Sequence, residues 1–355
     1  MMNPGLKRVY TRFAINFRYA FNIRKPRLMA RLAKNYFNLL FFKNIPLRYV
    51  DVAVDYRCNL RCLHCSAARF SRQSSEKMFL DDYRRLGRQC LEMGAVTVGL
   101  TGGEPTLCPD LGEIIKAFHP ERTMITLITN AVLFDEEKIL GFKKLGVDVL
   151  CVSLDSYSAD EHDAFRGVKG AHQKALQAID LALKHSLKVA VATTITHQNL
   201  RSDSIRSLIE MTKEKGLLMI FSLACPAGRW SREDEKILLD QEDIKYMNSL
   251  FGVYPHLRRD FESNWLTAGC GAGNEKLYFT PDGEVLPCPF IHITFGNVKK
   301  EPLPAIHARL MKIPEFKGYP PKCLSGEDRD FSGKYVVKAN TREKVPVDYT
   351  EIFTD

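Results

Sequence analysis

Three cysteines near the start of the chain have a spacing that can hold an iron–sulfur cluster. Cys58, Cys62 and Cys65 form a C-x-x-x-C-x-x-C triplet, which directly follows the apolar residues 52–54. Three thiolates on one loop can ligate three irons of a [4Fe–4S] cube and leave the fourth iron open to an outside molecule. The alternative is a structural zinc site, although such sites usually pair two C-x-x-C units across a long spacer.

A second segment carries groups suited to an amine ligand. Residues 101–106 read Thr-Gly-Gly-Glu-Pro-Thr after a predicted strand, so the glycines let the backbone approach a ligand while the carboxylate can receive an ammonium group. The triplet and this segment together resemble the radical S-adenosylmethionine (radical SAM) superfamily, in which SAM chelates the open iron. The resemblance implies that Gly102, Gly103 and Glu104 hold the methionyl amine of SAM.

Polar residues at other predicted strand ends extend the resemblance. It implies that Asn130 bonds the ribose or the carboxylate of SAM and that Ser153 offers a hydroxyl. Residues 161–167 resemble the family segment whose arginine pairs with the SAM carboxylate, which selects Arg166, a bidentate donor. Thr194 stands at the end of the fifth predicted strand. All four have a second interpretation as turn residues and helix caps.

The resemblance also implies a reaction. An electron from the cluster cleaves SAM to methionine and a 5′-deoxyadenosyl radical, which abstracts hydrogen from an unactivated carbon of the substrate. We expect oxidation, epimerisation or cross-linking of a peptide or small metabolite, with flavodoxin or ferredoxin as the electron donor. Two alternatives remain: modification of a membrane-associated lipid or amphiphile, and a non-catalytic iron–sulfur sensor, which would not need a SAM pocket.

Short apolar runs alternate with helical patterns from residue 50 to about residue 226. The predicted strands are 50–56, 96–101, 124–129, 148–154, 188–195 and 218–224. The predicted helices between them include 80–93, 110–118, 135–145, 171–186 and 201–215. Repeated β–α alternation implies a parallel sheet with helices outside it. Six such units predict an α/β fold, a partial (βα)6 TIM-like barrel with its site at the carboxyl ends of the strands.

A second group of cysteines follows the barrel region. Cys270 and Cys288 flank a Pro-Asp-Gly turn, which predicts a hairpin between residues 276–280 and 284–286 and brings the two thiols together. This spacing resembles the opening of SPASM and twitch domains, which bind auxiliary iron–sulfur clusters. The resemblance makes Cys323 the third ligand. We therefore expect a small C-terminal α+β domain with one auxiliary [4Fe–4S] cluster, the alternative being a domain without metal.

The fourth ligand of that cluster is left open by the sequence. In the SPASM pattern a second thiol follows in a C-x-x-C unit, but here Gly326 stands in its place. The ligand is then a carboxylate, a thiol from the barrel or the substrate, and the candidate residues are Glu327, Asp328, Asp330 and Cys225. Cys225 has a further possible role. It follows the sixth predicted strand, where its thiol can instead donate hydrogen to a substrate radical as a catalytic residue.

The basic charge of the chain belongs to its N-terminal arm. The net charge of the 355 residues is +9, but residues 1–50 contain eleven Lys or Arg and no Asp or Glu. Aromatic residues recur there at helical spacing, in residues 7–21 and again in residues 28–42, which predicts basic amphipathic helices. Such helices contact an anionic membrane surface or an anionic partner, or they pack on the barrel.

The expected division of the chain has three parts. They are a basic helical arm at residues 1–49, the barrel at 50–265, and a SPASM/twitch-like domain with a tail at 266–355. Ten clustered cysteines, with no secretory signal and no run of about 18 apolar residues, predict a cytoplasmic protein. Peripheral contact of the arm with a membrane is one of the two arrangements left open. Because the basicity is confined to the arm, we expect no nucleic-acid partner.

Overall fold

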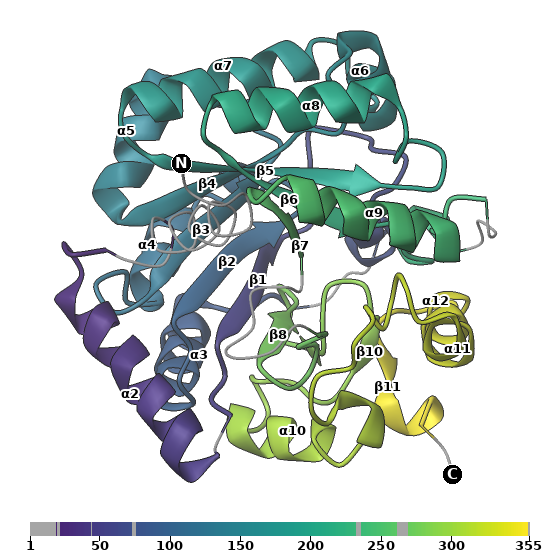
Figure 1. Ribbon diagram of the computed structural model, residues 1–355. Helices are drawn as coiled ribbons and strands as arrows, with labels where there is room; N and C mark the ends of the chain where they lie inside the picture. Colours follow the sequence, from purple (N-terminus) through teal and green to yellow (C-terminus); the bar gives the residue numbers. More distant parts are fainter. Residues whose placement is uncertain are drawn as a thin grey trace.

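The computed structural model describes residue 19 and residues 22–43, 45–72, 76–231, 236–260 and 269–353. A nine-stranded sheet organises the chain, in the order β7-β6-β5-β4-β3-β2-β1-β8-β9 (Figure 1). Its strands are β1 (Tyr49–Asp55), β2 (Thr97–Gly102), β3 (Met124–Thr129), β4 (Val147–Ser153), β5 (Lys188–Ile195), β6 (Leu218–Leu223), β7 (Leu257–Arg259), β8 (Lys276–Phe279) and β9 (Val285–Leu286). Neighbouring strands from β7 through β8 are parallel, whereas β9 is antiparallel to β8.

Helices connect successive strands of the barrel, as the alternating sequence pattern predicts. They are α3 (Leu80–Glu92), α4 (Leu111–Ala117), α5 (Glu136–Leu145), α6 (Ala159–Arg166), α7 (Ala171–Lys184), α8 (Asp203–Glu214) and α9 (Gln241–Val253). In Figure 1, α5, α7 and α8 cover one face of the sheet, where they contact β4, β5 and β6. The six predicted strands, the five predicted helices and the α/β fold are confirmed.

Local signals in the sequence set the ends of these helices. The Asp135 carboxylate accepts a hydrogen bond from Lys138 N at the start of α5, and Gly146 ends the same helix in the left-handed region, at a φ of 95°. Ser202 begins α8 by the same capping bond. With the helices on the outside, the parallel strands all end at one edge of the sheet, which is where a site is expected in such a fold.

The C-terminal part joins the same sheet, which the sequence did not indicate. β8 pairs in parallel with β1, so that Tyr49 lies opposite Lys276 and Val52 opposite Phe279. The predicted hairpin is confirmed, with β9 returning along β8 after a turn in which Gly283 has a φ of 93°. The remaining C-terminal elements are β10 (Ile293–Thr294), α10 (Leu303–Leu310), α11 (Arg329–Phe331), α12 (Lys338–Asn340) and β11 (Val347–Asp348).

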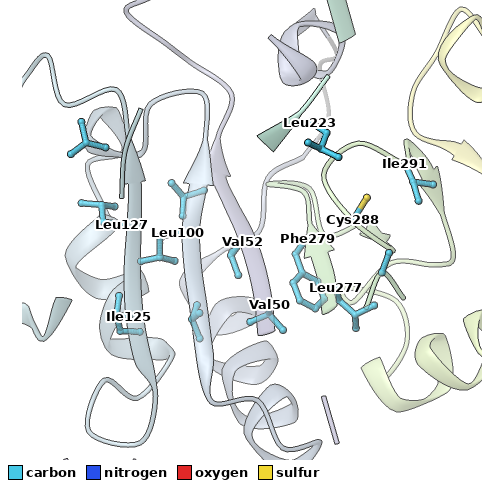
Figure 2. Packing of buried hydrophobic residues seen from close by; sticks show 14 of the residues in the cluster. Val50, Val52, Leu100, Ile125, Leu127, Leu223, Leu277, Phe279, Cys288 and Ile291 are labelled. Atoms are coloured by element: carbon cyan, nitrogen blue, oxygen red, sulfur yellow. The ribbon is translucent and has the colours of Figure 1, made fainter. Parts of the chain in front are cut away.

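The hydrophobic core runs without a break from the barrel into the C-terminal part. Figure 2 shows Val50, Val52 and Leu100 of the barrel strands near Leu277 and Phe279 of β8. All five side chains are fully buried and belong to one cluster of contacting residues. Because burial of apolar surface is the main force in folding, this shared core holds the two parts of the chain together.

The inner face of the barrel strands is different in character. Successive residues of a strand point to opposite faces, so the residues between the buried apolar ones face the inside of the barrel. Many of these inward residues are small or polar, among them Asp51, Thr97, Thr126, Cys151, Ala190, Ala192 and Ser222. Such side chains do not fill the barrel, and they leave an internal cavity of about 520 Å³.

Of the predicted N-terminal arm, the second helix is confirmed as α2 (Pro26–Phe42). It buries Leu28 and Leu39 and leaves an aromatic face exposed, formed by Phe37, Phe41 and Phe42. The first predicted helix, at residues 7–21, lies outside the described residues except for Tyr19. Within the described part of the chain, no helix is both long enough and apolar enough to cross a membrane. The division at residues 49 and 265 stays a prediction.

Candidate functional site

The cysteine triplet lies on the loop that follows β1, at the edge where the barrel strands end. Backbone hydrogen bonds tie this loop to the end of α6, since Arg61 N donates to Arg166 O at 3.1 Å and Leu63 N donates to Phe165 O at 2.9 Å. Cys65 O accepts a further bond, from Arg229 N at 3.1 Å. The three thiols form no disulfide. Hydrogen bonds to the end of α6 and to Arg229 fix the loop that carries them.

Two glycines at the end of β2 let the cysteine loop come close. A Cβ at Gly102 would lie 2.1 Å from Asp55 O, and one at Gly103 would lie 2.2 Å from Arg57 O. Gly102 has a φ of 133°, which side chains rarely allow. Gly103 N donates to Asp55 O at 2.8 Å. The close backbone approach predicted for these glycines therefore occurs against the chain's own cysteine loop.

The three thiols are not arranged as a closed zinc site. A tetrahedral zinc ion holds its sulfurs at about 2.3 Å, which places them about 4 Å apart. Among the described residues, the three ligand atoms found within 4.8 Å of one another belong to His197, Asp240 and Asp243, so at least one pair of the triplet's sulfurs is farther apart than that. Burial also raises the pKa of Cys58 to about 11, so its thiolate form needs a bound metal.

A cavity of about 220 Å³ opens beside the triplet. Six of the seven predicted SAM-binding residues line it, together with the three cysteines and Cys225: they are Gly102, Gly103, Asn130, Ser153, Arg166 and Thr194. These residues come from the ends of four strands and from α6, so the fold collects at one place side chains that are far apart in the sequence. Their individual contacts with SAM stay predictions.

Glu104, the seventh predicted residue, lies behind the wall of this cavity. Its carboxylate is 1% exposed and accepts hydrogen bonds from Thr106 Oγ1 and Thr129 Oγ1, both at 2.7 Å, and from Asn130 N at 2.9 Å. Burial raises the pKa of Glu104, and these bonds act against that rise. The carboxylate joins the end of β2 to the end of β3, and its contact with the SAM amine stays a prediction.

Arg166 forms a buried ion pair at the edge of the cavity. Its Nε lies 2.6 Å from Asp155 Oδ2, and its guanidinium also lies 3.8 Å from Cys62 Sγ. Burial disfavours the charged guanidinium, but the Asp155 carboxylate outweighs that effect and raises the pKa of Arg166. A cation beside Cys62 stabilises the thiolate that a metal requires.

Asp155 is a buried residue of this edge that the sequence analysis did not select. It stands two residues after Ser153, and its second carboxylate oxygen accepts a hydrogen bond from Thr194 N at 2.8 Å. It therefore connects the ends of β4 and β5 to Arg166. The sequence position of Asp155 could have indicated this, because an acidic residue just after a strand of a parallel sheet lies at the edge where sites form.

Aromatic side chains close one side of the cavity. The ring of His64 is stacked on Phe165 at 4.5 Å between centroids and lies 5.8 Å from Trp230. Burial, with a smaller contribution from Arg166, lowers the pKa of His64 to about 3, so this imidazole is neutral. These rings form an apolar wall beside the triplet, and such a wall excludes water from a reacting site.

The second group of cysteines surrounds a cavity of its own, between the end of β6 and the C-terminal hairpin. Cys270, Cys288 and Cys323 all line it, and Cys225 from the barrel lines it as well. The side-chain hydrogen bond to Cys323 lowers the pKa of Cys270, whereas burial raises that of Cys288 to about 12. Four sulfurs around one cavity form a donor set that fits an iron–sulfur cluster.

Two carboxylates that line the internal cavity, Asp51 and Asp260, face Lys276, which lines the neighbouring cavity of the C-terminal cysteines. Lys276 Nζ lies 3.4 Å from Asp51 Oδ2 and 3.4 Å from Asp260 Oδ2. Burial raises the pKa of Asp51, and Lys276 opposes the rise. The internal cavity and the one beside the triplet share lining residues, among them Thr101, Ile128, Ala192 and Ser222, so the two are neighbours.

On its other side, the triplet faces an open basin of about 1290 Å³. Exposed cationic side chains outnumber the acidic one in its lining: they are Arg57, Arg61, Arg229, Arg342 and Lys344, against Glu343. Arg69 contacts the carbonyl oxygens of Asn340 and Arg342, which places the C-terminal segment at the rim. The basin therefore presents positive charge beside the triplet, of which Cys58 is exposed.

Comparison with protein families matches both cysteine groups. Residues 54–211 match the model of the radical SAM superfamily, and residues 270–325 match SPASM, described as an iron–sulfur cluster-binding domain. Two curated relatives are described as AdoMet-dependent heme synthases. The one from Methanosarcina barkeri is 27% identical over 69% of this chain and 77% of its own length. The one from Nitratidesulfovibrio vulgaris is 24% identical over 75% and 81%.

Solved structures with the same fold include two from this superfamily. Streptococcus suis SuiB bound to precursor peptide SuiA matches with a TM-score of 0.62 at 19% identity, covering 84% of this chain and 72% of that one. Native anSMEcpe with bound AdoMet matches with a TM-score of 0.59 at 16% identity, covering 78% and 84%. At these identities the likeness concerns the fold, and it extends over both the barrel and the C-terminal part.

Proposed function

Since this chain is a radical SAM enzyme with a C-terminal SPASM domain, we propose that it abstracts hydrogen from a compact, polar metabolite held inside the barrel and thereby oxidises it. Its cofactors are SAM, a [4Fe–4S] cluster at Cys58, Cys62 and Cys65, and an auxiliary cluster in the SPASM domain. The bound clusters and SAM supply the electron transfer and the 5′-deoxyadenosyl radical that this oxidation requires.

The proximity of the two cavities carries the proposal. SAM would bind beside the triplet, and the cavity there shares Thr101, Ile128 and Ser222 with the internal cavity as lining. A volume of about 520 Å³ lies in the range of small-molecule pockets. Asp51 lines this cavity and pairs with Lys276, so its carboxylate supplies a charged anchor there for a polar substrate.

A metabolite is favoured over a peptide for two reasons. The internal cavity lies against the inner face of the barrel strands, which suits a compact molecule, whereas a peptide needs an extended groove for its backbone. The curated relatives at 24% and 27% identity are described as heme synthases, and heme is a small molecule. A peptide that inserted one side chain into the cavity is the alternative within the same reaction class.

The chain's own residues would position the reactants and keep water away. Arg166, fixed by Asp155, points a guanidinium into the SAM cavity, where it can pair with a carboxylate. Asn130 is oriented by a hydrogen bond from its Nδ2 to Asn59 Oδ1 at 2.8 Å. His64 stays neutral at working pH, so its stacked ring adds an apolar wall and no charge.

The cationic basin suits the electron donor. Flavodoxins and ferredoxins are acidic proteins, and positive charge around an entry point speeds the association of an acidic partner. The exposed Arg61, Arg229 and Arg342 stand at the rim on the outer side of the triplet. Their charge reversal should slow reduction by flavodoxin, and the effect should fade at high salt.

The test compares wild-type enzyme with Asp51→Asn after anaerobic reconstitution. A low-molecular-mass fraction and a peptide fraction of a cell extract are each added with SAM and dithionite, and 5′-deoxyadenosine is measured. We expect the low-molecular-mass fraction to stimulate the wild type, and Asp51→Asn to lose the stimulation while it retains the basal cleavage of SAM. Stimulation by the peptide fraction alone would contradict the proposed substrate class. Failure of the fully loaded enzyme to cleave SAM would favour the iron–sulfur sensor.

A second candidate function is modification of an amphiphile at a membrane surface. The observation in its favour is the exposed aromatic face of α2, where Phe37, Phe41 and Phe42 are 52%, 70% and 69% exposed beside basic residues of the arm. Such a face inserts into the interface of an anionic bilayer. The measurement is sedimentation with phosphatidylglycerol vesicles, in which Phe37→Ser/Phe41→Ser should lose binding. Equal sedimentation of wild type and variant would remove this candidate.

A further inference from the structure

We infer that Cys225, at the end of the sixth barrel strand, is the fourth thiolate ligand of the auxiliary cluster. The three ligands expected from the SPASM pattern come from the C-terminal part alone, whereas this fourth one comes from the barrel. The cluster would then join the two parts of the chain at one metal site. The inference depends on the presence of the auxiliary cluster and not on the substrate proposed above.

The position of the Cys225 sulfur is the first observation. Cys225 lines the same cavity as Cys270, Cys288 and Cys323 and is 5% exposed. Its Sγ lies 3.4 Å from Ser325 Oγ, and that same oxygen lies 3.4 Å from Cys323 Sγ. One small hydroxyl thus separates two sulfurs, each on the wall of a cavity that a cluster would occupy.

Gly326 provides the second observation. It stands where the SPASM pattern would place another thiol, and a Cβ built on it would lie 3.0 Å from Leu223 Cβ, 3.2 Å from Ala224 O and 3.5 Å from Cys225 Sγ. Position 326 is therefore packed against the end of β6 and the residues that follow it, Cys225 included. The place at which the C-terminal motif lacks a thiol thus lies beside a thiol of the barrel.

The competing carboxylates have other partners. Glu327 Oε2 accepts a hydrogen bond from Cys323 N at 2.8 Å, and its other oxygen lies 3.7 Å from Arg259. Asp328 Oδ1 caps α11 by accepting from Phe331 N at 3.0 Å. The exposed Asp330 lies in the first turn of that helix. None of these three acids lines the cavity, and the carboxylate that does, Asp260, is paired with Lys276 Nζ at 3.4 Å.

Ligation excludes the other role considered for Cys225. The same residue also lines the cavity beside the triplet, which is why hydrogen donation to a substrate radical was a reasonable expectation. A thiolate bound to iron has no hydrogen to donate, so only one of the two roles is open to it. Because three other cysteines line the same cavity, the role of Cys225 as a metal ligand is favoured over hydrogen donation.

The test uses a full-length chain in which Cys58, Cys62 and Cys65 are all changed to Ala, so that any remaining iron belongs to the auxiliary site. After anaerobic reconstitution this chain should bind about four irons per chain. Adding Cys225→Ser or Cys225→Ala should lower the count to about three or fewer, and the oxidised protein should show the electron paramagnetic resonance signal of a three-iron cluster. Adding Cys90→Ala, a buried cysteine of α3 outside both cavities, should change neither quantity.

A rescue experiment separates ligation from packing. In the Cys225→Ala background, Gly326→Cys should restore about four irons, whereas Gly326→Ala, which fills the same space without a thiol, should not. Four irons retained in both Cys225 variants, with an unchanged Mössbauer spectrum, would overturn the inference. Because iron and spectra are read without SAM or substrate, the outcome does not depend on whether the proposed reaction is right.

Discussion

Arg166 is the residue at which the cysteine loop, the SAM cavity and the barrel wall meet. Its backbone carbonyl accepts from Arg61 N, its side chain pairs with Asp155, and its guanidinium lies near Cys62 Sγ. A buried ion pair of this kind stabilises little by itself, because two charges have lost their water. Removal of one partner is costly, because the other charge remains buried and alone.

We therefore predict that Arg166→Ala lowers the free energy of unfolding by about 3 kcal/mol, because Asp155 loses its cation. Arg166→Lys should recover part of the stability but little of the SAM affinity, since an ammonium cannot form the bidentate contact. Denaturant unfolding and equilibrium dialysis with SAM are the measurements. The control is Arg206→Ala, which removes an exposed pair with Asp203 and should cost less than about 0.5 kcal/mol. A similar loss in both variants would contradict the argument.

Buried histidines make the molecule sensitive to acid. Burial lowers the pKa of His64 to about 3 and those of His162 and His292 to about 4, against about 6.5 in an unfolded chain. Below pH of about 6.5 the unfolded chain binds protons that the folded one does not, so stability falls as the pH falls. Each histidine contributes about 1.4 kcal/mol per pH unit to this loss.

The expected result is a free energy of unfolding that decreases steadily from about pH 6.5 to about pH 4.5. His162→Asn keeps an acceptor for the Asp155 backbone N–H but removes one titrating ring, so it should make the decrease less steep. Denaturant titrations at several pH values measure the slope. An identical slope in the variant would show that His162 titrates normally in the folded chain.

At the scale of elements, the end of β2 and the loop after β1 form the support of the triplet. The register of the parallel strands places Gly102 opposite Asp55, and the absence of side chains at Gly102 and Gly103 permits direct backbone contact. A helix or strand alone would not bring these groups together. The support exists only because β1 and β2 are neighbours in the sheet.

Gly102→Ala should therefore disrupt cluster binding. Its Cβ would lie 2.1 Å from Asp55 O, and its φ of 133° is unfavourable for alanine, so the loop must move. We expect reconstituted iron to fall by about half, with loss at the triplet and retention at the auxiliary site. Gly141→Ala is the matched control, because nothing lies within 4 Å of its Cβ and the helix α5 should gain about 0.5–1 kcal/mol. Full iron content in Gly102→Ala would disprove the idea that the contact between the end of β2 and the loop after β1 supports the triplet.

At the scale of the whole molecule, the barrel and the SPASM domain behave as one folding unit. They share a sheet through the pairing of β1 with β8, and they share a core in which Val52 and Phe279 are both fully buried. If the inference on Cys225 holds, they also share a metal site. Domains with their own cores unfold separately, whereas a shared core makes unfolding cooperative.

Phe279→Ala should accordingly destabilise both parts at once, by about 3–5 kcal/mol. Circular dichroism, which is dominated by the barrel helices, and hydrogen exchange of the β8 amides, which belong to the C-terminal part, should report a single shared transition shifted to lower denaturant. Phe41→Ala, on the exposed face of α2, should leave that transition in place. Two separate transitions in Phe279→Ala would mean that the barrel is stable without the C-terminal part.

The local parts of the fold followed directly from the sequence, because alternating polarity, caps and turn residues act over a few positions. Six strands, five helices of the barrel and the Pro-Asp-Gly hairpin were predicted in this way. The paired motifs around Cys58 and Gly102 also indicated the superfamily, since ligand spacing on one loop is a local property. The partners of Asp155 and Glu104 were not predictable, because their hydrogen bonds join different strands.

The sequence by itself determined which chemical groups this protein has, namely the two sets of cysteines, the pair Gly102 and Gly103, and the basic arm. Only the tertiary structure decided which groups act together: that β8 extends the barrel sheet, that Glu104 lies behind the cavity wall, and that Cys225 joins three cysteines from another part of the chain. The physical reason is the distance along the chain over which each kind of interaction acts. Local patterns specify elements, but a site of four sulfurs requires contacts between residues that only the packing of one shared core brings together.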